Sequence, residues 1–272
     1  MRASFIFTSF GMSLFSKLVA YARAAAVQHG PNLRGLPLIP KSLCPDPPGN
    51  REAFNQFVLW IHTLQLSRVN RVVDVGANHG DFSLAASALY PKAQVLLVEP
   101  MPTLQPELER RCARRSGRWR LESCALGSQP GSATLHVDPN LDAIGSLVGF
   151  SEEYLKASPL AKEGQTLACT VRTLDDLCVD RGIDTIDLLK IDVEGFEFET
   201  LRGGARMLRA TTALIIELSL VRRADGLRAL EEMLEVLSSA GLHLVECYPS
   251  LYSMETPWLP VEFNLLARRP TP

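Results

Sequence analysis

The sequence predicts an α/β protein whose β-sheet is largely parallel and covered by helices. From residue 71 onward, short apolar runs alternate with segments that have helical periodicity. This alternation is typical of α/β folds, because parallel strands need a crossover that a helix usually provides. Several runs are almost continuous in Val, Ile and Leu, as expected for strands buried on both faces. With 272 residues, the chain is long enough for one large domain of this class.

The expected elements follow one another with recognisable boundaries. Apolar residues at helical spacing from Phe54 to Leu66 predict the first helix, and Pro91 and Pro100 limit the elements before them. The expected strands are 71–75, 94–98, 119–123, 133–137, 167–171, 186–191, 213–218, 242–248 and 261–267, with 125–127 as the turn after the third. The other expected helices are 81–89, 102–115, 152–157, 174–180, one ending near 208, and 226–239. The last two strands flank a proline-rich loop and are expected to pair antiparallel.

The first fifty residues predict an extension ahead of the main domain. Residues 29–50 hold six prolines and three glycines and read as a linker, which places the domain at residues 51–272. The uncharged run from Ser4 to Ser16 leaves two interpretations open. The first is a signal peptide. The second is a soluble N-terminus: either translation starts at Met12 and residues 14–21 form an amphipathic helix, or the whole segment is an unprocessed soluble extension. The soluble, cytoplasmic interpretation is favoured, and membrane association through this segment stays an alternative.

Composition argues against several classes of protein. The hydrophobic fraction is 46%, the charged fraction 21% and the net charge −2, which together indicate an ordinary globular protein with no general attraction for nucleic acid. Six scattered cysteines include no Cys-x-x-Cys pair, so free thiols in a reducing compartment are expected. A basic cluster between Arg110 and Arg120 is expected to be a solvated helix face, with phosphate or an acidic glycan as the alternative ligand.

The most informative segment is the turn after the strand at 71–75. The strand ends in Asp74, and Gly76, Asn78 and Gly80 follow before the next helix. Glycine allows a sharp bend and a close approach to a ligand, and the unpaired N–H groups of the following helix point into the same crevice. Ligands of open α/β sheets bind at such carboxyl ends of strands.

Glu99 ends the second strand, where an acidic side chain can accept hydrogen bonds from both hydroxyls of a ribose. The glycine positions of a dinucleotide fingerprint hold Gly76, Asn78 and Asp81, so the third glycine is replaced by an acid that would repel a pyrophosphate. An NAD-dependent oxidoreductase is therefore the weaker interpretation. A cofactor that carries a sulfonium and an ammonium but no phosphate tolerates this acidity better.

A second acidic group follows the strand at 186–191. Asp192 and Glu194 terminate this buried strand beside the proposed cleft, whereas Glu197 is expected to stabilise the start of the next helix. Asp192 and Glu194 could hold an ammonium group, orient a hydroxyl or remove its proton. They could also bind a divalent ion, but the sequence identifies no companion ligands, so we expect no required metal.

Together these motifs resemble the FkbM family of S-adenosylmethionine-dependent methyltransferases. The resemblance covers residues 71–218 and rests on an ordered set of segments: 72–84, Glu99-Pro100, 125–127, 173–175 and 186–195. It implies a Rossmann-like class I methyltransferase fold with a seven-stranded, mostly parallel sheet and helices on both faces. It also implies S-adenosyl-L-methionine as cofactor and O-methylation of a hydroxyl on a small molecule, sugar, glycan or secondary metabolite.

The resemblance also implies roles for individual residues. Asp74, Gly76, Ala77, Asn78 and Gly80 would surround the methionine end of the cofactor. Glu99 and Pro100 would lie at its ribose, and Cys124 and Ala125 at its adenine. Asp192, Glu194 and His79 are the candidate catalytic residues, although an aliphatic residue is common in the family where His79 stands. Acceptor specificity is expected in the segments 138–165 and 249–260. The alternative from another class is a binding module that retains the cofactor but has lost transfer activity.

Overall fold

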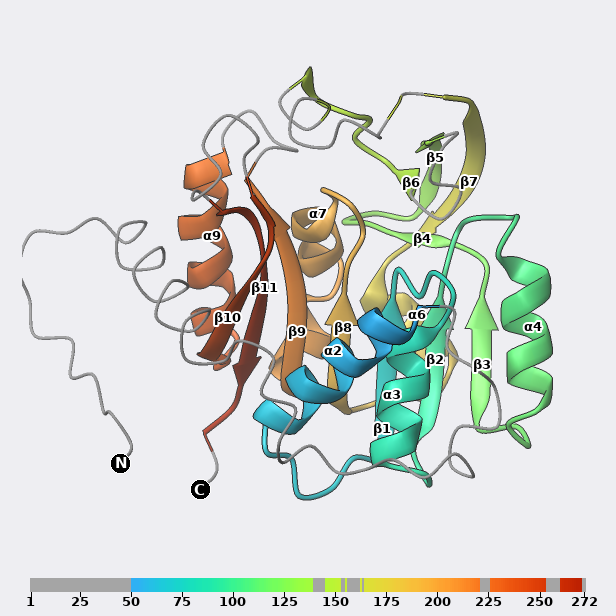
Figure 1. Ribbon diagram of the computed structural model, residues 1–272, viewed down its shortest axis with the longest axis vertical. Helices are drawn as coiled ribbons and strands as arrows, with labels where there is room; N and C mark the ends of the chain where they lie inside the picture. The colour runs from blue at the N-terminus through green and yellow to red at the C-terminus, as the bar shows by residue number, and fades with distance from the viewer. Residues whose placement is uncertain are drawn as a thin grey trace, which may run out of the picture.

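The computed structural model describes residues 50–138, 145–152, 155, 162, 164–220, 226–252 and 260–270, with only the backbone described at 226–229 and 251 (Figure 1). The expected extension therefore lies outside the described residues apart from Asn50, as does most of the helix expected at 152–157. Among the described residues, no helix is long and apolar enough to cross a membrane.

A seven-stranded sheet forms the centre of the fold, in the order β10-β11-β9-β8-β1-β2-β3. Only β11 runs against its neighbours, because it pairs antiparallel with both β9 and β10 while the other pairings are parallel. The expected mostly parallel sheet and its antiparallel final pair are thus confirmed. The strands are β1 (Arg71–Val75), β2 (Gln94–Val98), β3 (Trp119–Glu122), β8 (Ile186–Ile191), β9 (Thr211–Ser219), β10 (His243–Tyr252) and β11 (Pro260–Arg268).

A second, four-stranded sheet was not expected. It comprises β4 (Ala125–Leu126), β7 (Thr166–Arg172), β5 (Gly131–Val137) and β6 (Gly145–Ser146), in that order. The prediction that residues 125–127 only form the turn after the third strand is wrong, because Ala125 and Leu126 pair with Val171 and Arg172 of β7. A two-residue strand has too little periodicity to be recognised in a sequence.

Helices cover both faces of the main sheet (Figure 1). On one face lie α2 (Arg51–Thr63), α3 (Asp81–Leu89) and α4 (Gln105–Ala113), and on the other α6 (Leu174–Asp180), α7 (Glu197–Arg202), α8 (Ala205–Arg209) and α9 (Gly226–Ser239). The single helix expected to end near residue 208 is two helices, α7 and α8, separated by Gly203 and Gly204. A Cβ at Gly203 would lie 2.0 Å from the Gly127 carbonyl oxygen, so this close approach requires glycine.

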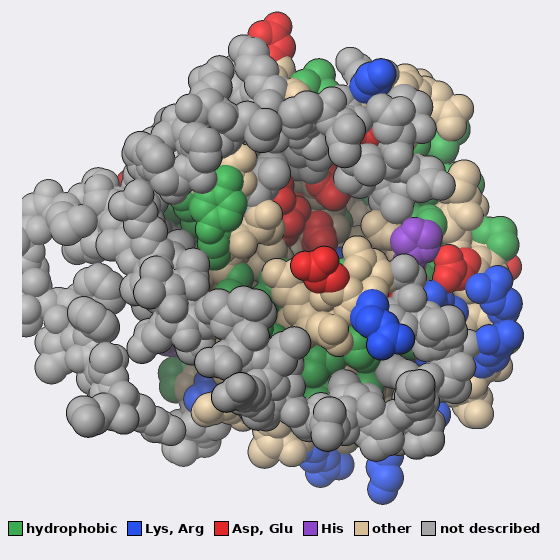
Figure 2. All heavy atoms as spheres, viewed as in Figure 1, with side chains coloured by type: hydrophobic (Ala, Val, Ile, Leu, Met, Phe, Trp, Pro, Cys, Tyr) green, Lys and Arg blue, Asp and Glu red, His purple; other side chains and the backbone are tan. Residues whose placement is uncertain are grey.

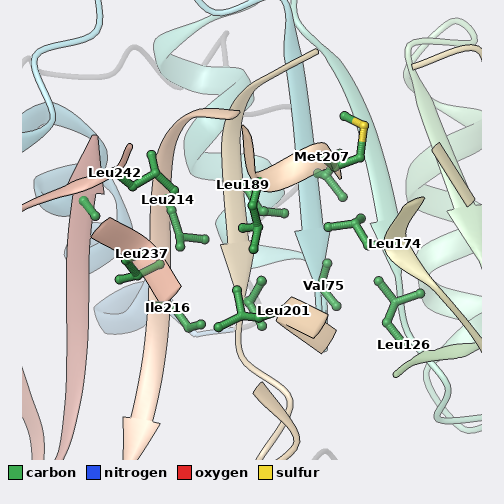
Figure 3. Close-up of a cluster of buried hydrophobic side chains, with 14 of the residues drawn as sticks. Val75, Leu126, Leu174, Leu189, Leu201, Met207, Leu214, Ile216, Leu237 and Leu242 are labelled. Carbon is green, nitrogen blue, oxygen red and sulfur yellow. The ribbon is translucent and has the colours of Figure 1, made fainter. Parts of the chain in front are cut away.

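The two faces carry separate apolar cores because successive strand residues point to opposite sides. Val73 and Val75 pack against α6 to α9, and Figure 3 shows Val75, Leu189 and Leu214 in this cluster. Val72 belongs to the other core, with residues of α2 and α3. Asp74 has the same parity as Val72, so this carboxylate is directed toward α2 and α3.

Local capping sets where the helices begin. The Asn50 side chain accepts hydrogen bonds from the backbone N–H groups of Glu52 and Ala53, and Thr173 accepts one from Asp176. Such caps satisfy N–H groups that have no partner within the helix. The Asp81 carboxylate in turn accepts a 2.6 Å hydrogen bond from the backbone of Asn50. This contact joins the start of α2 to the start of α3, directly after the proposed cofactor turn.

Candidate functional site

The turn after β1 packs backbone to backbone against the end of β8. Gly76 has φ +72°, and a Cβ at this position would lie 1.7 Å from the carbonyl oxygen of Asp192. The N–H groups of Gly76 and Ala77 both donate to the Val98 carbonyl, at 2.9 and 3.1 Å, which joins the turn to β2. Asn78 also has positive φ, at 51°. Only a residue without a side chain fits at Gly76. Through these contacts the ends of β1, β2 and β8 converge on this turn.

Glu99 lies at the end of β2, buried directly beside this turn. One carboxylate oxygen accepts the Asn78 N–H at 2.8 Å, and the other accepts the Met101 N–H at 2.9 Å. Burial raises the pKa of Glu99, although the two backbone hydrogen bonds oppose this shift. Each oxygen keeps a further lone pair, so the carboxylate can still accept hydrogen bonds from two ligand hydroxyls.

A cleft opens at this edge of the sheet, where the turn after β1, Glu99 and the end of β8 lie together. Two walls come from different sheets. The main sheet provides the β1 turn, the end of β2 and the end of β8. The four-stranded sheet contributes Leu126, Leu135 and Gly145, and Leu147 directly follows β6. Cys124 and Ala125 lie where the two sheets meet. A cleft with polar strand ends on one side and apolar residues on the other fits a cofactor with both a charged and an aromatic part.

Carboxylates gather at the β8 end of the cleft. Asp192 and Glu194 both line it, and Glu217 of β9 lies beside them, with one oxygen from each residue within 4.8 Å of the others. Figure 2 shows acidic side chains in a hollow on this face. Glu194 has φ +57°, and its carbonyl accepts a 2.6 Å hydrogen bond from the Ser146 hydroxyl of β6. The second sheet is therefore attached directly to the acidic end of the cleft.

Glu217 is the companion that the sequence did not identify for Asp192 and Glu194. Three carboxylates offer the oxygen ligands that Mg²⁺ and Ca²⁺ prefer. However, the Lys190 ammonium lies 3.1 Å from Asp192 and compensates part of this charge without a metal. The cluster can thus also bind hydroxyl or ammonium groups of an organic ligand.

Lys190 occupies the middle of a buried charged group. Its ammonium donates to the Gly76 carbonyl at 2.8 Å and lies 3.8 Å from Asp74, which is fully buried. The Ser83 hydroxyl of α3 donates to the other Asp74 oxygen at 2.6 Å. Burial raises the pKa of Asp74, and the nearby ammonium and Ser83 partly offset this effect.

The sequence-predicted residues fall into two groups. Most of them line the cleft: Gly76, Asn78, Glu99, Pro100, Cys124, Ala125, Asp192 and Glu194. Asp74, Ala77 and Gly80 are not among its lining residues and lie behind the turn, where Gly80 packs toward Leu108 and Leu97.

His79 also lies outside the cleft lining, and its ring Nδ1 contacts Glu107 of α4 at 2.9 Å. Glu107 is hydrogen-bonded by Arg111 as well, and although burial acts in the opposite direction, these two partners lower the pKa of its carboxyl. When Nδ1–H donates to Glu107, the ring Nε2 can still accept a proton, but a catalytic role would require this ring to reach the cleft.

Sequence reasoning missed Lys190 and Glu217. A lysine inside the apolar run 186–191 was the available signal, because a buried ammonium needs an anionic partner. Glu217 interrupts the run 211–219 in the same way. Asp81 was also expected from the sequence to face a ligand and repel a pyrophosphate. In the structure this buried carboxylate contacts Asn50 and Arg111 and does not line the cleft.

The basic cluster and the cysteines have mainly structural surroundings. Arg111 is buried against Glu107, and the guanidinium of Arg115 lies 4.8 Å from the centre of the Trp119 ring.

The five described cysteines are free thiols. Burial is the main cause that raises the pKa of Cys124 to about 11. This thiol therefore stays protonated at neutral pH and lines the cleft as an apolar side chain.

The fold and the cleft define a class of protein: a Rossmann-like α/β domain with a ligand cleft at the carboxyl edge of a seven-stranded sheet. The chain belongs to the FkbM methyltransferase family, since residues 74–244 match the family model described as the methyltransferase FkbM domain. The resemblance inferred from the motifs is thereby confirmed.

Three relatives illustrate this membership. Methyltransferase sdnD of Sordaria araneosa is 34% identical over 154 residues, covering 48% of this chain and 59% of its own. The 2-O-methyltransferase NoeI of Sinorhizobium fredii is 28% identical, with 63% and 72% covered. The 31-O-demethyl-FK506 methyltransferase FkbM of Streptomyces tacrolimicus is 31% identical, with 56% and 66% covered. The matches thus span 59% to 72% of the length of these relatives.

Proposed function

We propose that this protein transfers a methyl group from S-adenosyl-L-methionine to a hydroxyl oxygen of a small molecule, sugar, glycan or secondary metabolite. One observation carries the proposal: the β1 turn, Glu99 and the pair Asp192 and Glu194 line a single cleft. Family membership supports the cofactor, and the names of two relatives describe O-methylation. The net charge of −2 supports a small-molecule acceptor over nucleic acid. The free thiols support a reducing, cytoplasmic compartment.

The residues of the cleft fit the proposed cofactor. The absence of a side chain at Gly76 leaves backbone at the cleft surface, where the methionine end would lie next to Asn78. Glu99 would accept hydrogen bonds from the ribose hydroxyls, and Pro100 would border the sugar. Cys124 and Ala125 would contact the adenine, beside the apolar side chains of the second sheet. Asp74, Ala77 and Gly80 would act from behind the turn by fixing its shape.

Methyl transfer to a hydroxyl requires a group that accepts the hydroxyl proton, and the acidic end of the cleft would provide it. When bound, the cofactor supplies a methyl group on a sulfonium, so the acceptor oxygen gains a C–O bond while the C–S bond breaks and its electrons go to sulfur. The hydroxyl proton must leave during this transfer, because an ordinary alcohol is not ionised at neutral pH. Asp192 or Glu194 would accept that proton. Alignment of the oxygen and exclusion of water would provide much of the rate.

Binding and transfer can be tested separately with labelled cofactor. Calorimetry should show S-adenosylmethionine binding that weakens at least tenfold in Glu99→Ala. The matched control, Glu109→Ala, removes an exposed acid from α4 and should bind normally. Unchanged binding in Glu99→Ala would refute the ribose assignment.

Transfer is measured by mass spectrometry of sugars, glycans and polyketide-type alcohols incubated with the labelled cofactor. Asp192→Asn and Glu194→Gln should each lower transfer more than cofactor binding, and the larger loss identifies the proton acceptor. Binding without transfer to any acceptor would instead favour the non-catalytic binding module. Binding of a nicotinamide dinucleotide in place of S-adenosylmethionine would support the oxidoreductase alternative.

A further inference from the structure

Lys190 links two chain segments that the cleft requires to be close together. Its ammonium donates to the Gly76 carbonyl at 2.8 Å and forms an ion pair with Asp192 at 3.1 Å. Gly76 belongs to the turn after β1, and Asp192 follows β8. These two residues both line the cleft, whereas Lys190 does not. The lysine therefore contacts both walls from behind.

The surroundings hold this ammonium in place. Lys190 is 4% exposed, and its partner in the parallel register is Asp74 of β1. The Phe57 ring of α2 lies 6.0 Å from the nitrogen, within the range of a cation–π contact. Burial acts to lower the pKa of Lys190, but Asp192 and Asp74 outweigh it and the pKa is raised. The side chain is charged at neutral pH and has few positions available.

We propose that Lys190 is a positioning residue of the cofactor cleft, which fixes the Gly76 turn and the Asp192 carboxylate relative to each other. The inference rests on the proposed function for the identity of the ligand. Lys190 acts through Gly76 and Asp192 and does not itself touch the cofactor. Its ammonium keeps the Gly76 carbonyl directed away from the ligand and holds the Asp192 carboxylate at the edge of the cleft.

A purely structural role is the competing explanation. Asp74 is fully buried, and its carboxylate needs a nearby cation whether or not a ligand binds. If charge compensation were the whole role of Lys190, Lys190→Met combined with Asp74→Asn would match Asp74→Asn alone in both stability and cofactor affinity. If the lysine also positions the cleft, the double variant would match Asp74→Asn in stability but not in cofactor affinity, because the Gly76 carbonyl and Asp192 would still lack their donor.

The test compares five variants of the full chain, Asp74→Asn among them, by calorimetry with S-adenosylmethionine and by urea unfolding. Lys190→Met should weaken cofactor binding at least tenfold, as expected for the loss of charge-assisted hydrogen bonds. Lys190→Met combined with Asp74→Asn should have the unfolding midpoint of Asp74→Asn alone, but it should bind the cofactor at least tenfold more weakly than Asp74→Asn. Lys190→Arg retains the cation and its donors but is bulkier, so it should recover only part of the affinity that Lys190→Met loses. Lys92→Met, at an exposed loop lysine, is the matched control and should change neither measurement.

Each outcome distinguishes the inference from the proposed function. Equal cofactor affinity in the double variant and in Asp74→Asn would overturn the positioning role, and the lysine would then serve only to compensate Asp74. A double variant that does not fold would also overturn it, because Lys190 would be required for folding itself. Absence of cofactor binding by the unmodified protein would overturn the proposed function, and this inference with it.

Discussion

Gly76→Ala tests whether the contact between the β1 turn and the end of β8 is as close as the structure indicates. The added Cβ would lie 1.7 Å from the Asp192 carbonyl oxygen and 2.8 Å from its carbon. Both atoms belong to the backbone, so no side-chain rotation can relieve the overlap. The two segments would have to separate by about 1.3 Å to reach the shortest ordinary contact of 3.0 Å.

The magnitude follows from two contributions. A left-handed backbone conformation costs a non-glycine residue roughly 1–2 kcal/mol. Overpacking in a close-packed region adds about 1–3 kcal/mol. Gly76→Ala should therefore lower the free energy of unfolding by roughly 2–5 kcal/mol, and cofactor affinity should fall at least tenfold because the turn is displaced.

Gly117→Ala separates the two contributions. Gly117 has φ +74°, close to the +72° of Gly76, but a Cβ there would meet no atom within 4 Å. This control should lose only the backbone contribution of about 1–2 kcal/mol and should bind the cofactor normally. Urea unfolding and calorimetry measure both quantities. Equal losses of stability in the two variants would refute the reasoning, since the overlap with Asp192 would then contribute nothing.

Three further predictions concern the carboxylates and one structural arginine. Burial raises the pKa of Glu99 above its ordinary 4.5, so acidification should begin to protonate this carboxylate at a pH above 4.5 and thereby weaken cofactor binding. Calorimetry at several pH values measures this effect. The same pH dependence in Glu99→Gln would contradict the prediction. Ser83→Ala removes the 2.6 Å hydrogen bond to buried Asp74 and should lower the free energy of unfolding by about 1–3 kcal/mol, whereas exposed Ser239→Ala should change it by less than about 0.5 kcal/mol. Arg269 donates to the carbonyls of Thr211, Leu208, Arg209 and Ala240. Arg269→Ala should therefore lower the free energy of unfolding in urea by roughly 2–4 kcal/mol. A decrease no larger than that caused by exposed Arg110→Ala would count against this role.

Many strands of the main sheet and several helices that cover it could be predicted, because each has a local cause. The ranges 71–75, 81–89, 94–98, 174–180, 186–191 and 226–239 agree with the structure. Their apolar periodicity, or their boundaries at proline and glycine, are visible in the chain itself. The small sheet was harder, since β4 and β6 have two residues each and exist only through pairing with β7 and β5.

The candidate site could also be predicted only in part. The residues at strand ends were identified because the carboxyl ends of parallel strands meet at one edge, so Asp192 and Glu194 line the same cleft as Gly76 and Glu99. The contact of His79 with Glu107 could not be predicted, because it depends on how α4 packs beside the turn. Glu217 joins the acidic cluster only because β9 lies next to β8.

The sequence by itself determined the α/β class, the positions of most strands and the glycine turn with its acidic neighbours, because periodicity and backbone requirements act over a few residues. Tertiary structure decided the order of the strands and which side chains meet. Asp74 and Lys190 are 116 residues apart and come together only through the pairing of β1 with β8. A buried charge is tolerated only where its partner is within reach, and that depends on packing between segments that are distant in the chain.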